Sequence, residues 1–128
     1  MSNTGQANEL RLPPIGFGMW DDVAQTVKDT GGRPLVPDID RDAAQLAILH
    51  QAINLGYRHF DTAEMYAAGH SETILGRALL EQERSDFVVT SKVSAENLAY
   101  DDLLAACERS LCLLYTSPSP RDLSTSRM

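Results

Sequence analysis

Apolar residues recur at three- and four-residue steps in three stretches of the chain, a spacing that predicts three amphipathic helices. The first is expected over about residues 41–55, with Asp40 as its N-cap and Gly56 as its stop. The second is expected over about 71–81, and the third begins near Tyr100. The side chains expected to face the core are Ala43, Leu46, Ala47, Leu49 and Ile53 in the first helix, Ile74, Leu75, Ala78 and Leu79 in the second, and Leu103, Leu104, Cys107 and Leu111 in the third.

Short apolar runs precede these helices and have the character of β-strands. They cover residues 15–18, 57–60 and 87–91, and the last is continuous in apolar and β-branched residues, as in a strand covered on both faces. Residues 21–40 hold two glycines and two prolines among polar residues and are expected to form a long loop. Strand and helix alternate about three times, so the sequence predicts an α/β fold with a parallel sheet and crossover helices.

The composition is that of an ordinary globular chain, with 128 residues of which 43% are hydrophobic and 23% charged. This length suffices for one modest core and is too short for two domains of typical size. Eleven lysines and arginines stand against eighteen aspartates and glutamates, which gives a net charge of −7. Such a surface repels nucleic-acid phosphates and anionic lipids, so neither a nucleic acid nor a membrane is expected as a partner.

No apolar run approaches the roughly 20 residues that span a bilayer, and the first ten residues lack the basic and apolar regions of a secretory signal. We therefore expect a cytoplasmic protein. The two cysteines, Cys107 and Cys112, lie five residues apart in one predicted helix and point to different faces. They make a poor disulfide or metal pair, so we expect no metal site and interpret the thiols as buried apolar groups.

The character of the chain changes from Cys112 onward. The tail is rich in serine, threonine and proline, which is typical of a disordered C-terminus. The run CLLYTSPSPRD over residues 112–122, however, resembles the translation of a transposase sequencing adaptor, and residues 126–128 match the constant arm that follows a variable index. On this hypothesis residues 112–128 are not native, and the biological sequence breaks off near Leu111 within the third helix.

Three residues that can share proton chemistry lie at the ends of two predicted strands. Asp61 ends one strand, Tyr66 lies on the loop after it, and Lys92 ends the next strand. The carboxyl ends of neighbouring parallel strands lie on one rim of a sheet, so these side chains can meet there. An ammonium beside a phenol favours the phenolate, and a carboxylate keeps the ammonium charged and oriented. Together they make a proton donor for an alkoxide that forms at a carbonyl carbon.

Each of these residues also has a plain structural role available. The aspartate can cap a turn, the tyrosine can be a surface aromatic, and the lysine can be a solvated charge at the sheet edge. Their joint occurrence within one long string of motifs favours the chemical interpretation. That string reads GYRHFDTAEMY over residues 56–66, GHSE over 69–72, LGRAL over 75–79 and TSK over 90–92.

The string resembles the aldo-keto reductase family, in which the patterns G-Y-R-H-x-D-T-A-x-x-Y, G-x-S-E-x-x-L-G-x-A-L and a strand ending in S-K follow one another in this order. The resemblance covers residues 12–111. It implies a TIM-type (β/α)8 barrel, of which residues 1–111 supply the N-terminal part with about three βα units. It also implies an NADPH hydride donor and a small-molecule carbonyl substrate.

The same resemblance implies a role for each member of the cluster. Tyr66 matches the catalytic acid, Lys92 the residue that makes the tyrosine more acidic, and Asp61 the partner of the lysine and a contact of the cofactor. The family's fourth catalytic residue, a histidine at the end of the next strand, would lie beyond Leu111. That position is matched by none of the histidines of this chain, which are His50, His59 and His70.

The first predicted strand carries a second part of the resemblance. Residues 16–20 read GFGMW and resemble the G-x-G-T-W segment whose backbone lies beside the nicotinamide and whose tryptophan lines the substrate pocket. This implies Gly18 and Met19 as cofactor contacts and Trp20 as a substrate contact, although Met19 lacks the hydroxyl of the usual threonine. The alternative is a flexible first strand with a core tryptophan. By itself the G-x-G is a weak dinucleotide signal, because Asp21 stands where a Rossmann fingerprint has its third glycine.

Several polar residues near the motifs are expected to be structural. Ser71 and Glu72 are expected to start a helix with an acidic first turn that favours the helix dipole, and we assign them no chemistry. Arg77 and Arg84 are expected to be solvated charges on helix faces.

Two other functions stay open. The aldo-keto fold also serves as a non-enzymatic, nucleotide-binding regulatory module in channel β subunits, whose matching segment also reads D-T-A-E-x-Y, although the GYRH run favours the metabolic reductases. The second alternative is a small α/β binding domain that folds by itself. This alternative holds only if residues 112–128 are native sequence. If the barrel interpretation holds, the sheet of this short chain has an unpaired edge, and we expect the isolated chain to fold poorly and to lack activity.

Overall fold

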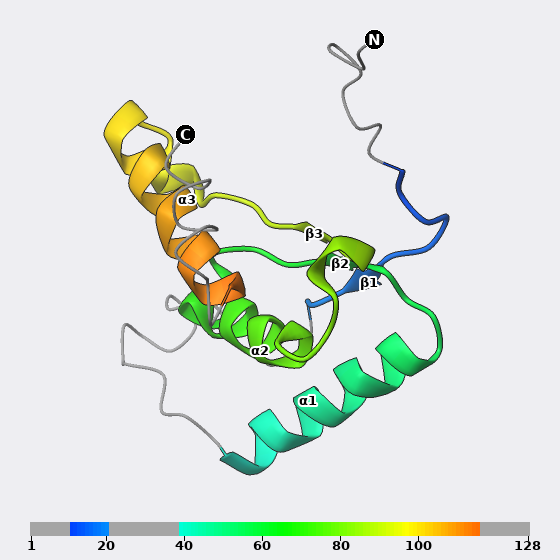
Figure 1. The fold of residues 1–128 in the computed structure, drawn as a ribbon. Coiled ribbons are helices and arrows are strands. Elements are labelled where there is room, and N and C mark those ends of the chain that lie inside the picture. The colour runs from blue at the N-terminus through cyan, green and yellow to red at the C-terminus, as the bar shows by residue number, and fades with distance from the viewer. Residues whose placement is uncertain (1–10, 21–38, 116–128) are drawn as a thin grey trace, which may run out of the picture.

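The computed structural model describes residues 11–20 and 39–115, in which strand and helix alternate as predicted (Figure 1). The strands and main helices are β1 (Phe17–Gly18), α1 (Ile39–Asn54), β2 (His59–Asp61), α2 (His70–Leu79), β3 (Val88–Thr90) and α3 (Tyr100–Leu114). Three short 3-10 helices lie in the connections, η1 (Tyr66–Gly69), η2 (Arg84–Asp86) and η3 (Ala95–Asn97). Residues 21–38 of the predicted loop lie outside the described residues, whereas residues 39 and 40, also predicted as loop, belong to α1. In the described ranges no helix is both long and apolar enough to cross a membrane.

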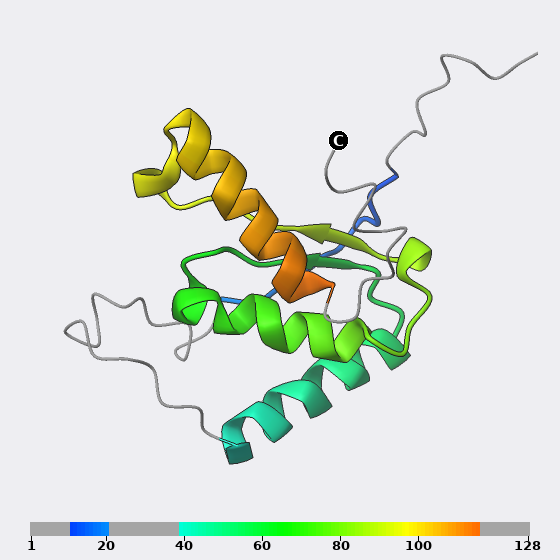
Figure 2. The ribbon, with the colours of Figure 1, turned by 60° about the vertical axis from the view of Figure 1, so that its left-hand side comes forward.

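The three strands form one parallel sheet in the order β1-β2-β3. Phe60 at the centre of β2 aligns with Phe17 of β1 on one side and with Val89 of β3 on the other. Helices α1 and α2 lie on the same side of this sheet, and α3 packs against α2 (Figures 1 and 2). The expected α/β fold of consecutive parallel βα units is confirmed.

The hydrophobic core lies between the sheet and the helices. Phe60 is fully buried, and the ring centroids of Phe17 and Phe87 lie 5.7 and 6.2 Å from its own. The buried helical members of this cluster are Leu49, Ala52, Ile53, Ile74, Leu75, Ala78, Leu79 and Leu114. All four side chains predicted for the inner face of α2 are among them, so that prediction is confirmed.

Helix α1 begins earlier than the sequence predicted. Asp40 lies in its first turn rather than at its N-cap, so the capping prediction is wrong. A carboxylate in the first turn also favours the helix dipole, and the same residue type is therefore expected at either position. Ala43 and Ala47 are exposed, and Ala52 is the small residue that the helix buries. Gly56 ends the helical segment with φ of +102°, as predicted.

The inner face predicted for α3 is wrong by about one helical position. Leu103 is half-buried, whereas Leu104, Cys107 and Leu111 are exposed, and Ala106 and Leu114 are the buried residues. Apolar residues are spread around most of this helix, so their periodicity fits more than one rotation. Contact with α2 selects the rotation that buries Ala106 and Leu114. Both free cysteines are exposed, which corrects the expectation of buried thiols.

Helix α3 continues past the predicted end of native sequence. Leu114 packs in the core, and the guanidinium carbon of Arg84 lies 4.8 Å from the ring centroid of Tyr115. An apolar run extends an amphipathic helix whatever its origin, so the predicted boundary stays a prediction. Arg84 also donates to the carbonyl of Phe87 and is half-buried, so its prediction as a solvated charge is wrong, whereas Arg77 is exposed as expected.

The opposite face of the sheet carries small and polar side chains. Side chains alternate along a strand, and the register therefore puts Gly18, Asp61 and Thr90 in one row on this face. None of these three residues is buried. The sheet thus has one face covered by helices and one open face, which carries a charged side chain.

Candidate active site

Asp61, Tyr66 and Lys92 come together at one end of the sheet. Asp61 is the last residue of β2 and Lys92 lies just beyond β3, so the parallel register brings both to the same rim. The Nζ of Lys92 lies 3.0 Å from each carboxylate oxygen of Asp61 and 3.4 Å from the Oη of Tyr66. It also donates to the carbonyl of Thr62 at 2.9 Å. The three residues that the sequence singled out therefore form one cluster around a single ammonium.

The surroundings of Lys92 favour its charged form. Burial lowers its pKa, but the hydrogen bonds and charges of Asp61 and Tyr66 outweigh this effect and raise the pKa above its ordinary value. The side chains of Lys92 and Asp61 are 49% and 39% exposed, so water screens the pair and its contribution to stability is small. The arrangement fixes a positive charge beside a phenol at the rim of the sheet.

The loop between β2 and α2 bends sharply where it presents Tyr66. Ala67 and Ala68 have φ of +49° and +53°, in the left-handed region that alanine rarely adopts. Behind the bend, the buried hydroxyls of Thr62 and Ser71 are hydrogen-bonded to each other at 2.9 Å. Such strain persists only where the surrounding structure imposes it, and it is common at functional sites.

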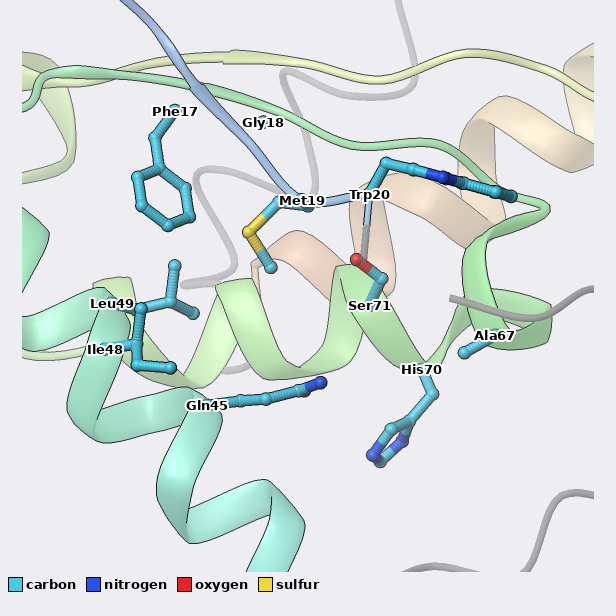
Figure 3. A pocket seen from close by; sticks show the side chains of 10 residues that line it. All are labelled: Phe17, Gly18, Met19, Trp20, Gln45, Ile48, Leu49, Ala67, His70 and Ser71. Atoms are coloured by element: carbon cyan, nitrogen blue, oxygen red, sulfur yellow. The ribbon is translucent and has the colours of Figure 1, made fainter. Parts of the chain in front are cut away.

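A cavity of about 290 Å³ lies beside the cluster, between the end of β1, α1 and the start of α2 (Figure 3). The side chain of Met19 points toward the helices and packs against the core, while its amide donates to the carbonyl of Asp61 at 2.8 Å. Trp20 lines the cavity and meets the ring of Tyr66 edge to face, with centroids 5.0 Å apart. The residues after β1 therefore border both the cavity and the cluster.

Gly18 leaves space on the open face of the sheet. It is in register with Asp61, and a Cβ added at Gly18 would meet no atom of the described residues within 4 Å. At Gly16, by contrast, an added Cβ would lie 2.9 Å from the Nδ1 of His59. The two glycines thus differ, because Gly16 makes room for a neighbouring side chain while Gly18 leaves a flat surface next to the cluster.

Two glutamates to which the sequence analysis assigned no chemistry hold the segments that carry the cluster. Glu72 is 1% exposed and accepts a hydrogen bond from the hydroxyl of Ser91, next to Lys92. Its Oε2 is buried without a hydrogen-bond partner in the described part of the chain. Glu72 lies in the first turn of α2, as predicted, and its carboxylate is also buried and bound to Ser91, which the sequence analysis did not predict. A signal was available, because Glu72 precedes Leu75 by three and Leu79 by seven residues and thus lies on the inner stripe of α2.

Glu64 is the second of these residues. It lies in the loop between Asp61 and Tyr66 and reaches the segment after β3, where Ser94 and Asn97 donate hydrogen bonds to its carboxylate. The reductase pattern D-T-A-x-x-Y leaves this position open, and spacing alone gave no reason to single it out.

The histidines lie outside the cluster, as expected. The Nε2 of His59 lies 2.9 Å from the hydroxyl of Thr90, and the Nε2 of His70 lies 2.7 Å from a carboxylate oxygen of Asp42 in α1. His50 is exposed on α1. Within residues 11–20 and 39–115, no group of three or more histidine, cysteine or acidic residues could hold a metal ion.

These features define a class of protein built from parallel βα units, with an aspartate, a tyrosine and a lysine in contact at the carboxyl ends of its strands. Residues 14–119 match the family model described as the Aldo/keto reductase family. The chain belongs to this family, and the predicted membership is confirmed.

Curated relatives include both enzymes and a channel component. Methylglyoxal reductase YeaE of Escherichia coli (strain K12) is 33% identical over 110 residues, which cover 86% of this chain and 34% of that protein. A putative voltage-gated potassium channel subunit beta of Schizosaccharomyces pombe is 51% identical over 47 residues, which cover 35% of this chain and 14% of that protein. The chain spans about a third of the length of the reductase.

A solved structure supports the fold assignment. The aldo/keto reductase of Klebsiella pneumoniae, crystallised with NADP and acetate, superposes with a TM-score of 0.64 at 30% identity. The superposition covers 80% of this chain and 31% of that one. The fold of this chain is therefore part of a TIM-type (β/α)8 barrel, as expected.

Proposed function

We propose that this chain is the N-terminal part of an NADPH-dependent reductase that converts aldehydes or ketones to alcohols. The observation that carries the proposal is the position of Lys92, whose Nζ contacts the carboxylate of Asp61 and the hydroxyl of Tyr66 at once. Among family members, a methylglyoxal reductase matches most of the chain, which supports a carbonyl substrate.

In this proposal Tyr66 is the general acid. Its hydroxyl gives a proton to the oxygen of the substrate carbonyl as negative charge develops there, and the product is an alcohol. The ammonium of Lys92 stabilises the phenolate that remains, and Asp61 holds the ammonium in place through both of its carboxylate oxygens. The raised pKa of Lys92 keeps it charged while the proton moves.

The residues of the rim fit a nicotinamide cofactor. Gly18 leaves open space beside Asp61, and a flat ring can lie there without meeting a side chain. We assign cofactor contacts to Gly18, the backbone of Met19 and Asp61. When bound, NADPH supplies the hydride that the carbonyl carbon receives. The related Klebsiella pneumoniae structure, which holds NADP, supports this choice.

Trp20 is proposed as the substrate contact. The residue is 59% exposed and its indole stands edge-on to Tyr66, so a group bound against the indole lies next to the proposed acid.

The proposal is tested with Tyr66→Phe in the complete protein that contains this chain. We expect the rate of aldehyde-dependent NADPH oxidation to fall about 10²- to 10⁴-fold, because the ring stays in place and only the acidic proton is lost. Binding of NADPH, measured by titration of the intrinsic fluorescence, should be unchanged. A variant that keeps full turnover would refute the assignment of Tyr66.

A second candidate is a nucleotide-binding regulatory module without a metabolic reaction. The observation in its favour is the stretch that is 51% identical to a potassium channel subunit beta. It predicts that the complete protein binds NADPH and reduces carbonyl compounds slowly if at all, with no dependence on Tyr66. The same measurements therefore separate the two candidates.

We further propose that residues 1–111 are the native partial barrel domain and that residues 112–128 are a non-native, adaptor-derived tail. The adaptor-like run and the limited share of the relatives that the chain spans support this division. Source codons that differ from the adaptor would exclude it. The chain of 128 residues by itself is expected to show no turnover, because most of the barrel wall is absent from it.

A further inference from the structure

Glu64 joins three segments of the chain around the cluster. Its Oε2 accepts a hydrogen bond from the backbone amide of Ser94 at 2.9 Å, and the amide group of Asn97 lies 3.0 and 3.2 Å from its two oxygens. The guanidinium of Arg109 in α3 donates to Oε1 at 3.0 Å. The backbone amide of Glu64 donates to the carbonyl of Lys92, also at 3.0 Å. One residue of the loop after β2 is therefore tied to the loop after β3 and to α3.

The donors around Glu64 require a carboxylate. Burial raises its pKa, but the hydrogen bonds from the Ser94 amide, Arg109 and Asn97 outweigh this effect and lower the pKa below the ordinary value. The side chain is only 15% exposed, and both oxygens accept from donors. A glutamine would turn one NH2 group toward those donors and could not satisfy them.

These contacts bear on the proposed chemistry because of where Glu64 lies in the chain. It stands between Asp61 and Tyr66 on one loop, and it contacts Lys92 and Ser94 on the other. The separation of 3.4 Å between the Lys92 ammonium and the Tyr66 hydroxyl depends on how these two loops sit relative to each other. We propose that Glu64 is a positioning residue that sets this separation and thereby the rate at which Tyr66 delivers its proton. This inference rests on the proposed reductase function.

A purely structural role for Glu64 is the alternative to be tested. Loss of a residue that only stabilises the fold would lower the amount of folded protein. It would also weaken the binding of substrate and of cofactor and slow the reaction. Loss of a positioning residue lowers kcat but leaves the affinity for the cofactor unchanged, and the effect on kcat arises only through Tyr66. Misplacement of a catalytic group by about 1 Å can slow a reaction about 10²-fold.

The test uses Glu64→Gln in the complete protein, with Glu96→Gln as the matched control. Glu96 is an exposed residue of η3 on the same loop, and its substitution changes the net charge by the same amount. We expect Glu64→Gln to lower kcat about tenfold with little change in KM or in the Kd for NADPH, and Glu96→Gln to change none of them. If Glu64→Gln fails to fold, Arg109→Gln removes one exposed donor and should lower kcat less, with the same pattern.

The decisive comparison repeats Glu64→Gln in a Tyr66→Phe background. A positioning residue that acts through Tyr66 has no further effect there, because the group it positions is gone. A loss of kcat that persists at full size in that background, or an unchanged kcat in the single variant, would overturn the inference while leaving the reductase function intact. If the wild-type protein instead shows no turnover that depends on Tyr66, the proposed function fails first and the role of Glu64 fails with it.

Discussion

Phe60 and Asp61 are neighbours in β2, yet their side chains lie in opposite surroundings. Phe60 points toward α1 and α2 and is fully buried among other aromatic and aliphatic side chains. Asp61 points to the open face, where it binds the ammonium of Lys92 and stays partly exposed. The alternation of a strand has placed a fully buried phenylalanine of the core next to a charged member of the proposed active site.

The two faces differ in what they contribute. On the helix-covered face, burial of apolar area supplies the free energy of folding. On the open face, a screened ion pair adds little stability, but it holds together the charges that the proposed proton transfer needs. Substitutions on the first face should therefore change stability and spare the reaction, and substitutions on the second should do the opposite.

The largest effect is expected from Phe60→Ala. The cavity left by a fully buried phenylalanine should lower the free energy of unfolding of the complete protein by about 3–5 kcal/mol, measured by urea denaturation. Phe60→Leu, which fills much of the same volume, serves as the control with a smaller loss. The rate per folded molecule should stay close to that of the wild type. A folded variant with a strongly reduced rate would show that the two faces cannot be separated.

Lys92→Met should show the reverse behaviour. Removal of the ammonium should lower kcat about 10²-fold, because the phenolate of Tyr66 loses its neighbouring charge. The free energy of unfolding should change by less than about 1 kcal/mol, since the ion pair with Asp61 is exposed to water. Lys92→Arg keeps the charge and should retain more activity. A loss of stability as large as that of Phe60→Ala would contradict the comparison.

The helices differ in how correctly the sequence predicted their buried residues. Helix α2 has one apolar stripe and contacts both α1 and α3, so its four inner residues were predicted correctly. Helix α3 has apolar residues around most of its circumference, and its rotation depends on contacts that spacing does not encode. This explains why Leu104 was predicted inside and Ala106 proved to be the buried residue.

The sequence predicted those residues of the proposed site whose positions follow from the order and direction of the strands alone. Asp61 and Lys92 follow neighbouring parallel strands, and the strand-end rule brings them to one rim whatever the side-chain details. Glu64 was missed because its role depends on distant partners, such as Arg109, 45 residues away. For Glu72 the spacing indicated an inward position but not its partner Ser91, 19 residues away. A pattern along the chain records spacing within one segment, and it does not record contacts between segments.

The smallest effect is expected in the pH dependence of stability. It separates the contribution of Glu64, on the loop after β2, from that of Lys92, on the loop after β3. The folded-state pKa of Glu64 lies below its ordinary value of 4.5, so its contribution is complete above that value and is lost as the pH falls through the folded pKa. The pKa of Lys92 is raised above 10.5, so its contribution is complete below that value and is lost as the pH rises through the folded pKa. Urea unfolding across pH should therefore show a shallower acid limb for Glu64→Gln and a shallower alkaline limb for Lys92→Met, each relative to wild type. If Glu64→Gln left the acid limb unchanged, its carboxylate would not be held by Ser94, Asn97 and Arg109 in solution, and the two loops would be linked without it, by the backbone contact of Glu64 with Lys92 and by the contacts of the Lys92 ammonium.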